Sequence, residues 1–107
     1  MFKSWSDARP VAMMPGLTRR TLGVGEKVLM AEFRLTAGTV VQSHSHPYEQ
    51  VGYVASGRMR FTVGSEEHVM EPGDVYVAVS GEPHGATCLE DAVMVEVFAP
   101  PRDDFKT

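Results

Sequence analysis

The sequence GTVVQSHSHPYEQVGYVASG, residues 38–57, carries two histidines two positions apart in a segment with β character. Residues i and i+2 of a β-strand point to the same side, so His44 and His46 can direct two imidazole nitrogens to one point. A proline then interrupts the strand, and the chain resumes with Glu49 and Gln50, which must face opposite ways. Two interpretations of the segment are open at this point: a metal site, to which only one of Glu49 and Gln50 could contribute, or a polar loop that carries imidazoles.

A metal site of this kind needs a third donor. The candidate is His84 in SGEPHG, residues 80–85, because the flanking glycines and proline place it in a turn between two predicted strands, at the mouth of a barrel. His68 lies in the charged run SEEHVM and is interpreted as a surface residue, since a lone histidine is more often a polar side chain than a ligand.

Most of the remaining chain predicts short β-strands. Ten glycines and seven prolines separate segments in which apolar and polar residues alternate, and no segment holds a helical period. Gly64 and Ser65 predict a hairpin turn, and EPGD at 71–74 predicts another turn. This pattern favours an all-β sandwich or barrel, and a jelly roll fits the length. The residues predicted to share a face are Leu29, Ala31, Phe33 and Leu35; Met59, Phe61 and Val63; and Ala92, Met94, Glu96 and Phe98.

Glu96 is unusual because its three companions on that face are apolar. Two interpretations are open: a functional carboxylate inside the barrel, or a surface acid at the edge of the sheet.

The composition limits the class of protein. A chain of 107 residues fits one domain, residues 1–107, and a net charge of -4 with scattered basic residues excludes a nucleic-acid binder. Cys88 is the only cysteine, which favours a reducing compartment and a cytoplasmic location. No run of 18 apolar residues occurs, so the sequence predicts a soluble protein that does not enter a membrane.

The motif G-x5-H-x-H-x3-Q-x6-G at 38–57, together with PGDVYVAVSGEPHG at 72–85, resembles the two motifs of the cupin superfamily. The resemblance implies a single double-stranded β-helix (jelly-roll) barrel over about residues 28–99, with N- and C-terminal arms outside it. It also implies a homodimer and one divalent metal ion per chain. The implied ligands are His44, His46, Gln50 and His84.

The glutamine gives this ligand set a distinct charge. Three neutral imidazoles and a neutral amide oxygen leave the full charge of +2 on the metal, which favours an anionic partner. The same ligand types suit Zn, Ni, Fe, Mn or Co, and the spacing does not choose among these metals.

Among cupins, HSHPYEQVGYVASGRMRFTVG and EVFAPPRDDF resemble the KdgF-type proteins of pectin and alginate breakdown, which open the ring of 4,5-unsaturated monouronates. By position, the family's catalytic acid corresponds to Glu96, where an aspartate is usual, its aromatic residue to Phe98, and its arginine to Arg102. The expected roles are proton transfer for Glu96 and pairing with the uronate carboxylate for Arg102. The competing interpretation of Arg102 is a tail residue that pairs with Asp103 or Asp104.

We therefore expect a metal-dependent enzyme that acts on a small anionic uronate. Two alternatives stay open: a metal-dependent cupin dioxygenase acting on a small enolic substrate, and a non-catalytic module that binds a sugar acid or a metal.

Overall fold

Eight antiparallel β-strands and two short 3-10 helices form the protein in the computed structural model, which describes all 107 residues. No helix has the length and apolar character needed to cross a membrane. The predicted all-β fold class is confirmed. The elements are η1 (Trp5–Asp7), β1 (Pro10–Met14), β2 (Leu17–Val24), β3 (Leu29–Leu35), β4 (Val40–His44), β5 (Glu49–Val63), β6 (Glu66–Met70), β7 (Val75–Ala78), β8 (His84–Ala99) and η2 (Asp103–Phe105).

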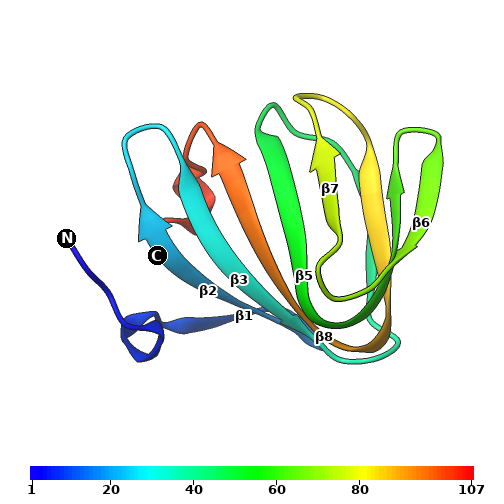
Figure 1. Ribbon diagram of the computed structural model, residues 1–107. Helices are drawn as coiled ribbons and strands as arrows, with labels where there is room; N and C mark the ends of the chain where they lie inside the picture. The colour runs from blue at the N-terminus through cyan, green and yellow to red at the C-terminus, as the bar shows by residue number, and fades with distance from the viewer.

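The two longest strands, β5 and β8, each contribute to both layers of the barrel (Figure 1). Residues 50–53 of β5 pair with β7, whereas residues 59–63 pair with β6. Residues 84–87 of β8 pair with β4, and residues 92–98 pair with β3. The register between β5 and β8 shifts between Val54 and Met59, where the strands bend. One half of the β5–β8 pair therefore belongs to each layer, and the barrel interior lies between these two halves.

Gly57 lies at this bend and has a φ of 83°. A Cβ atom at this position would collide with the backbone carbonyl of Asp91 on β8. A side chain is therefore excluded on two grounds, the left-handed backbone conformation and the close approach of the neighbouring strand.

The core follows the predicted faces. Leu29, Ala31, Phe33 and Leu35 of β3 are buried, as are the four alternating residues of β8 that begin at Ala92. The predicted turns also form: Gly64 and Gly73 both have positive φ, and the N–H of Asp74 donates to the carbonyl of Glu71. Alternation of apolar residues thus identified the inner face of the principal strands.

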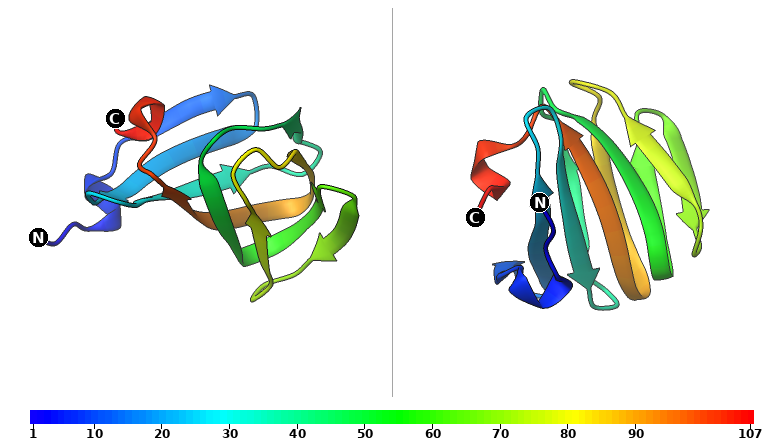
Figure 2. Two further views of the ribbon diagram at one scale, coloured as in Figure 1. Left: turned by 90° about the horizontal axis from the view of Figure 1, so that it is seen from above. Right: turned by 60° about the vertical axis from the view of Figure 1, so that its left-hand side comes forward.

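The sheet begins earlier in the chain than the predicted barrel of residues 28–99. β1 pairs with β2 and β2 pairs with β3, so much of the predicted N-terminal arm belongs to the sheet. The C-terminal segment lies against the inner side of β2 and β3 (Figure 2). There the Thr21 hydroxyl donates to the carbonyl of Phe105, whose ring is buried. This segment closes one side of the barrel and carries Arg102 to the cavity.

Candidate metal centre and cavity

Three histidines meet at one end of the barrel. His44 is the last residue of β4 and His84 is the first residue of β8, and the two are direct partners in the register of these strands. His46 lies beyond the end of β4, in the link to β5. The expectation that both histidines belong to one β-strand therefore holds for His44 alone. One ligand atom from each ring lies within 4.8 Å of the others. The structure thus brings the three predicted histidines together.

The backbone fixes which nitrogen of each imidazole faces the cluster. The Nδ1 atoms of His44, His46 and His84 lie 2.8, 3.0 and 2.9 Å from backbone carbonyl oxygens. A carbonyl only accepts, so Nδ1 carries the hydrogen and Nε2 presents a lone pair. Metal-bound histidines commonly use this arrangement, in which a hydrogen bond orients the ring. The carbonyls belong to Gln42, Tyr48 and Glu82, respectively.

His84 gives the clearest indication that a cation fits here. Its side chain is almost completely buried, and its Nε2 has no hydrogen-bond partner. Burial lowers the pKa of His84, with the neighbouring His44 and His46 acting in the same direction, so the ring is held neutral. A buried lone pair without a partner is costly, and a coordinated metal ion would satisfy it.

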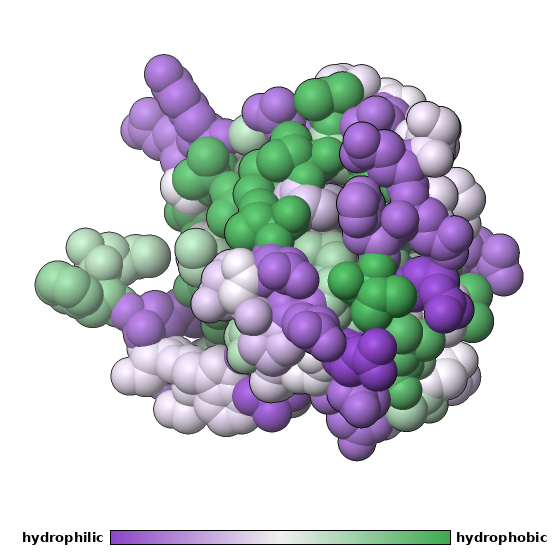
Figure 3. Space-filling model, turned by 45° about the vertical axis from the view of Figure 1, so that its right-hand side comes forward, coloured by the Kyte–Doolittle hydropathy of each residue, from purple (hydrophilic) through white to green (hydrophobic).

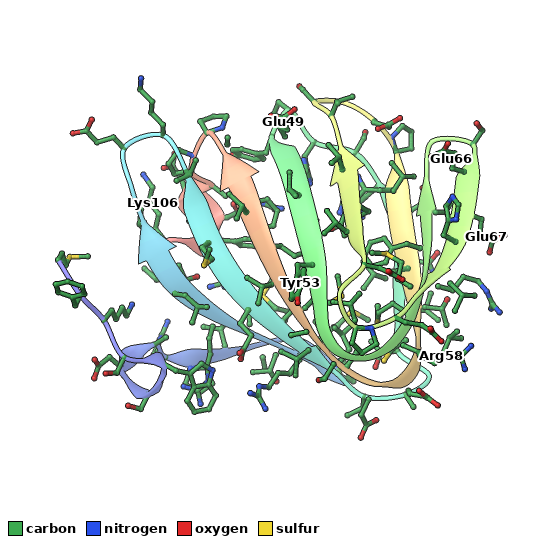
Figure 4. All side chains as sticks on the ribbon, viewed as in Figure 1. Glu49, Tyr53, Arg58, Glu66, Glu67 and Lys106 are labelled. Atoms are coloured by element: carbon green, nitrogen blue, oxygen red, sulfur yellow. The ribbon has the colours of Figure 1, made fainter.

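Gln50 completes the cluster through its amide oxygen. Gln50 is buried on the inner face of β5, and its Oε1 lies 2.9 Å from Nε2 of His46. With Nδ1 of His46 as the donor to a carbonyl, these two facing atoms are both acceptors, an arrangement that a cation between them relieves. Glu49, labelled in Figure 4, is exposed and belongs to the other face of β5. Gln50 therefore faces the histidines, as the resemblance implied.

The neutral charge of Gln50 leads to a testable expectation. Gln50→Glu should bind Co²⁺ roughly tenfold more tightly or better, because a carboxylate near the cation adds a favourable charge interaction. The same change should weaken the binding of acetate to the Co²⁺-loaded protein. Chelator competition and acetate titration measure the two effects. Val69→Glu, which adds the same charge at an exposed position of β6, is the matched control. Undiminished acetate binding by Gln50→Glu would contradict the role assigned to the neutral amide.

Glu96 lies inside the barrel next to this cluster. It is 8% exposed, and its Oε2 accepts hydrogen bonds from Gln50 Nε2, at 2.5 Å, and from the Tyr76 hydroxyl. Burial raises the pKa of Glu96 to about 7, against the opposing effects of the Gln50 hydrogen bond and the positive charge of Arg102. The interpretation of Glu96 as a surface acid is wrong.

Arg102 forms an ion pair in the C-terminal segment and also reaches the cavity. Its Nη2 and Nε donate to the two carboxylate oxygens of Asp104, at 2.8 and 3.2 Å, so the predicted tail ion pair forms. The guanidinium also lies over the Phe105 ring, 3.8 Å from its centroid, and lines the same cavity as Glu96. The aromatic ring and the carboxylate hold this arginine at the cavity wall.

A cavity of about 290 Å³ connects these groups. Its volume is near the lower end for ligand pockets, and hydrophobic side chains make up most of its wall. Such a space suits a small molecule with a few polar groups. The polar residues that line it include His44, His84, Gln50, Tyr76, Glu96 and Arg102.

Sequence reasoning missed the part that Tyr76 plays. Tyr76 is buried on β7, and the hydrogen bonds of its hydroxyl to Gln50 and Glu96 join three strands that are distant in the sequence. A signal did exist, since Gly52 in the opposing strand leaves room for a large ring.

Comparison with known proteins identifies relatives of this chain. The family model described as "Cupin domain" matches residues 31–99. The pectin degradation protein KdgF of Dickeya dadantii is 30% identical over 92 residues, which cover 84% of each chain. The structure of KdgF from Halomonas sp. superimposes with a TM-score of 0.92 at 28% identity, covering 97% of this chain and 96% of that one. An RmlC-like cupin from Shewanella frigidimarina gives a TM-score of 0.93 at 26% identity, covering 97% and 94% of the two chains.

Proposed function

Because this chain belongs to the cupin family, we propose that it is a metal-dependent enzyme that opens the ring of 4,5-unsaturated monouronates. The observation that carries the proposal is the shared cavity, in which a carboxyl group with a pKa of about 7 and an arginine accompany the histidine cluster. The similarity to two KdgF proteins, one of them named for pectin degradation, supports the same substrate class.

The proposed metal ligands are His44, His46, Gln50 and His84. The unpartnered Nε2 of His84 and the facing acceptors of His46 and Gln50 support this assignment. A divalent ion at these ligands, one of Zn, Ni, Fe, Mn or Co, supplies a Lewis acid for an oxygen of the sugar.

The proposed chemistry needs proton transfer and no change of oxidation state. An unsaturated monouronate is a cyclic enol ether, and its ring opens when the anomeric hydroxyl loses a proton and C4 gains one. Glu96 is suited to both transfers, because a group with a pKa of about 7 is present in both protonation states near neutral pH. The cavity walls exclude bulk water around this carboxyl group, which is the origin of its raised pKa.

Arg102 is the proposed partner of the uronate carboxylate. Asp104 accepts hydrogen bonds from Nε and Nη2 of the guanidinium, and Nη1 is left for a ligand. Since a hydrogen bond between charged groups contributes roughly 1.5–3 kcal/mol, Arg102→Ala should raise KM by about 10–100-fold with a smaller effect on kcat. Lys106→Ala removes a nearby exposed cation and should leave KM unchanged. An unaltered KM for Arg102→Ala would contradict this role.

The activity is tested with the metal-loaded protein and a purified 4,5-unsaturated monouronate. The absorbance of its conjugated enol ether should disappear faster than in buffer, without oxygen or a nicotinamide. Decay at the buffer rate would overturn the proposal. Oxygen uptake with an enolic substrate would then support the dioxygenase, and saturable uronate binding without turnover would support the binding module.

The homodimer implied by the resemblance remains a proposal. The outer face of the sheet offers an apolar surface for it, since Met30, Val97, Val51 and Val77 lie side by side across four strands. Three of these four side chains are exposed: Met30, Val51 and Val77. Figure 3 shows hydrophobic side chains gathered among hydrophilic ones on this side of the molecule. A second copy of the chain would remove such a surface from water.

A further inference from the structure

A triangle of hydrogen bonds deep in the barrel connects Tyr76 with two proposed functional residues. One amide hydrogen of Gln50 is donated to Oε2 of Glu96, and Nε2 also lies 2.5 Å from the Tyr76 hydroxyl oxygen. The Tyr76 hydroxyl donates its own hydrogen to the same Oε2 of Glu96. The amide nitrogen of Gln50 therefore has its acceptor oxygens on the side away from the histidines.

This pattern determines the orientation of the Gln50 amide. With Nε2 engaged by Tyr76 and Glu96, Oε1 points toward Nε2 of His46, where it lies at 2.9 Å. A rotation of the amide by 180° would place Oε1 beside the oxygens of Tyr76 and Glu96, and the hydrogen bonds that Nε2 donates to these oxygens would be lost. The orientation of the oxygen ligand thus depends on acceptors contributed by β7 and β8.

The Tyr76 ring is itself held in place by its surroundings. Tyr76 is directly opposite Gly52 in the pairing of β7 with β5, and a Cβ atom on Gly52 would overlap the ring. The other contact is a stacked Phe61 ring, with centroids 4.2 Å apart and an interplanar angle of 26°. The phenol is therefore fixed by contacts that do not involve its hydroxyl group.

We infer that Tyr76 is a positioning residue, whose hydroxyl directs the Gln50 amide oxygen at the metal centre and holds the Glu96 carboxyl group beside it. Gly52 supports this role because its missing side chain admits the ring. The part that concerns Glu96 rests on the proposed ring-opening function, whereas the part that concerns Gln50 depends only on the ligand set.

Tyr76→Phe tests this inference because it keeps the ring and removes one oxygen atom. The loss of an outer partner of a metal ligand typically lowers metal affinity or activity by about 10–100-fold. We expect that decrease in Co²⁺ affinity, together with a displaced side-chain amide resonance of Gln50 in the metal-free protein. The apolar contacts of the ring remain, so the variant should stay folded. Tyr53→Phe is the matched control, because Tyr53 is exposed on the outer face of β5 (Figure 4).

A second variant separates positioning from the chemistry of the hydroxyl group. Gly52→Ala keeps the hydroxyl but displaces the ring, so it should reproduce the weaker Co²⁺ binding of Tyr76→Phe. Parental Co²⁺ affinity and an unchanged Gln50 amide resonance in Tyr76→Phe would overturn the inference. If the parent protein opens no uronate while Tyr76→Phe still weakens Co²⁺ binding, the proposed function fails and the positioning role of Tyr76 toward Gln50 stands.

Discussion

His84→Ala is expected to lower Co²⁺ affinity by about two to three orders of magnitude, because roughly 10–16 kcal/mol of binding free energy is typically shared among four ligands. His84 is the most buried of the three clustered histidines, and its Nε2 has no other partner in the protein. Its Nδ1 donates a hydrogen bond to the carbonyl of Glu82, and a rotation of the ring would break that hydrogen bond.

The same substitution should leave the barrel folded. β8 is held by backbone pairing with β3, β4 and β5, and none of these pairs depends on the imidazole. Removing a buried acceptor without a partner also removes its desolvation cost, which offsets part of the packing lost with the ring. Circular dichroism and thermal unfolding of the metal-free protein measure this, and Co²⁺ absorption spectra measure the affinity.

His68→Ala provides the control for His84→Ala. His68 is exposed on β6 and belongs to no cluster, so its removal should leave Co²⁺ binding at the parental level. Parental binding by a folded His84→Ala variant would instead place the metal elsewhere and would also remove the basis of the proposed Lewis acid.

The sequence predicted the inner faces of the barrel because alternation is a local property. Phe33, Met59 and Met94 were assigned to buried faces from their immediate neighbours, and all three are buried. Glu96 was placed on an apolar face by the same alternation, although the sequence left open whether that face was inside. The histidines were grouped by a motif resemblance, since nothing local connects His84 with His44, 40 positions earlier in the chain.

β2 was missed for a physical reason. Its inner face carries Arg19 and Thr21, which are buried but polar, so the strand lacks an apolar stripe. Both residues hydrogen-bond to backbone carbonyls of the C-terminal segment, at Thr107 and Phe105 respectively. When polar side chains on the inner face of a strand hydrogen-bond to a segment far away in the sequence, alternation of apolar residues cannot identify the strand, because the partners of these side chains are not local.

The position of His46 and the role of Tyr76 depended on tertiary structure in the same way. His46 lies two residues beyond the end of β4 at His44, and the carbonyl of Tyr48 orients its ring. The role of Tyr76 is inferred from the hydrogen bonds of its hydroxyl with Gln50 and Glu96, which belong to different strands. The sequence identified ligand types, and the fold determined how their orientation is held.

Glu96→Gln is expected to slow ring opening of a 4,5-unsaturated monouronate by about 10²–10⁴-fold, the usual contribution of general acid-base catalysis. The substitution is nearly isosteric, and the new amide oxygen can still accept hydrogen bonds from Gln50 and the Tyr76 hydroxyl, so the fold and the Co²⁺ affinity should be retained. What is lost is a group that can take up and release a proton near neutral pH, a property that burial gives to Glu96. KM should change little, because Arg102, and not Glu96, is the proposed carboxylate partner.

Initial rates under anaerobic conditions, with metal content measured on the same samples, make the comparison for Glu96→Gln. Glu49→Gln is the matched control: it neutralises a carboxylate on the exposed face of β5, one residue from Gln50, and should retain the parental rate. Glu96→Asp shortens the arm by one methylene but keeps a titratable group, and it should recover part of the activity that Glu96→Gln loses. Turnover by a metal-loaded Glu96→Gln variant within a few-fold of the parent would show that another group moves the proton. The role of proton transfer would then have to be reassigned to one of the remaining polar residues of the cavity. Tyr76 would be the first candidate, because its hydroxyl already donates to the carboxyl group that Glu96→Gln removes.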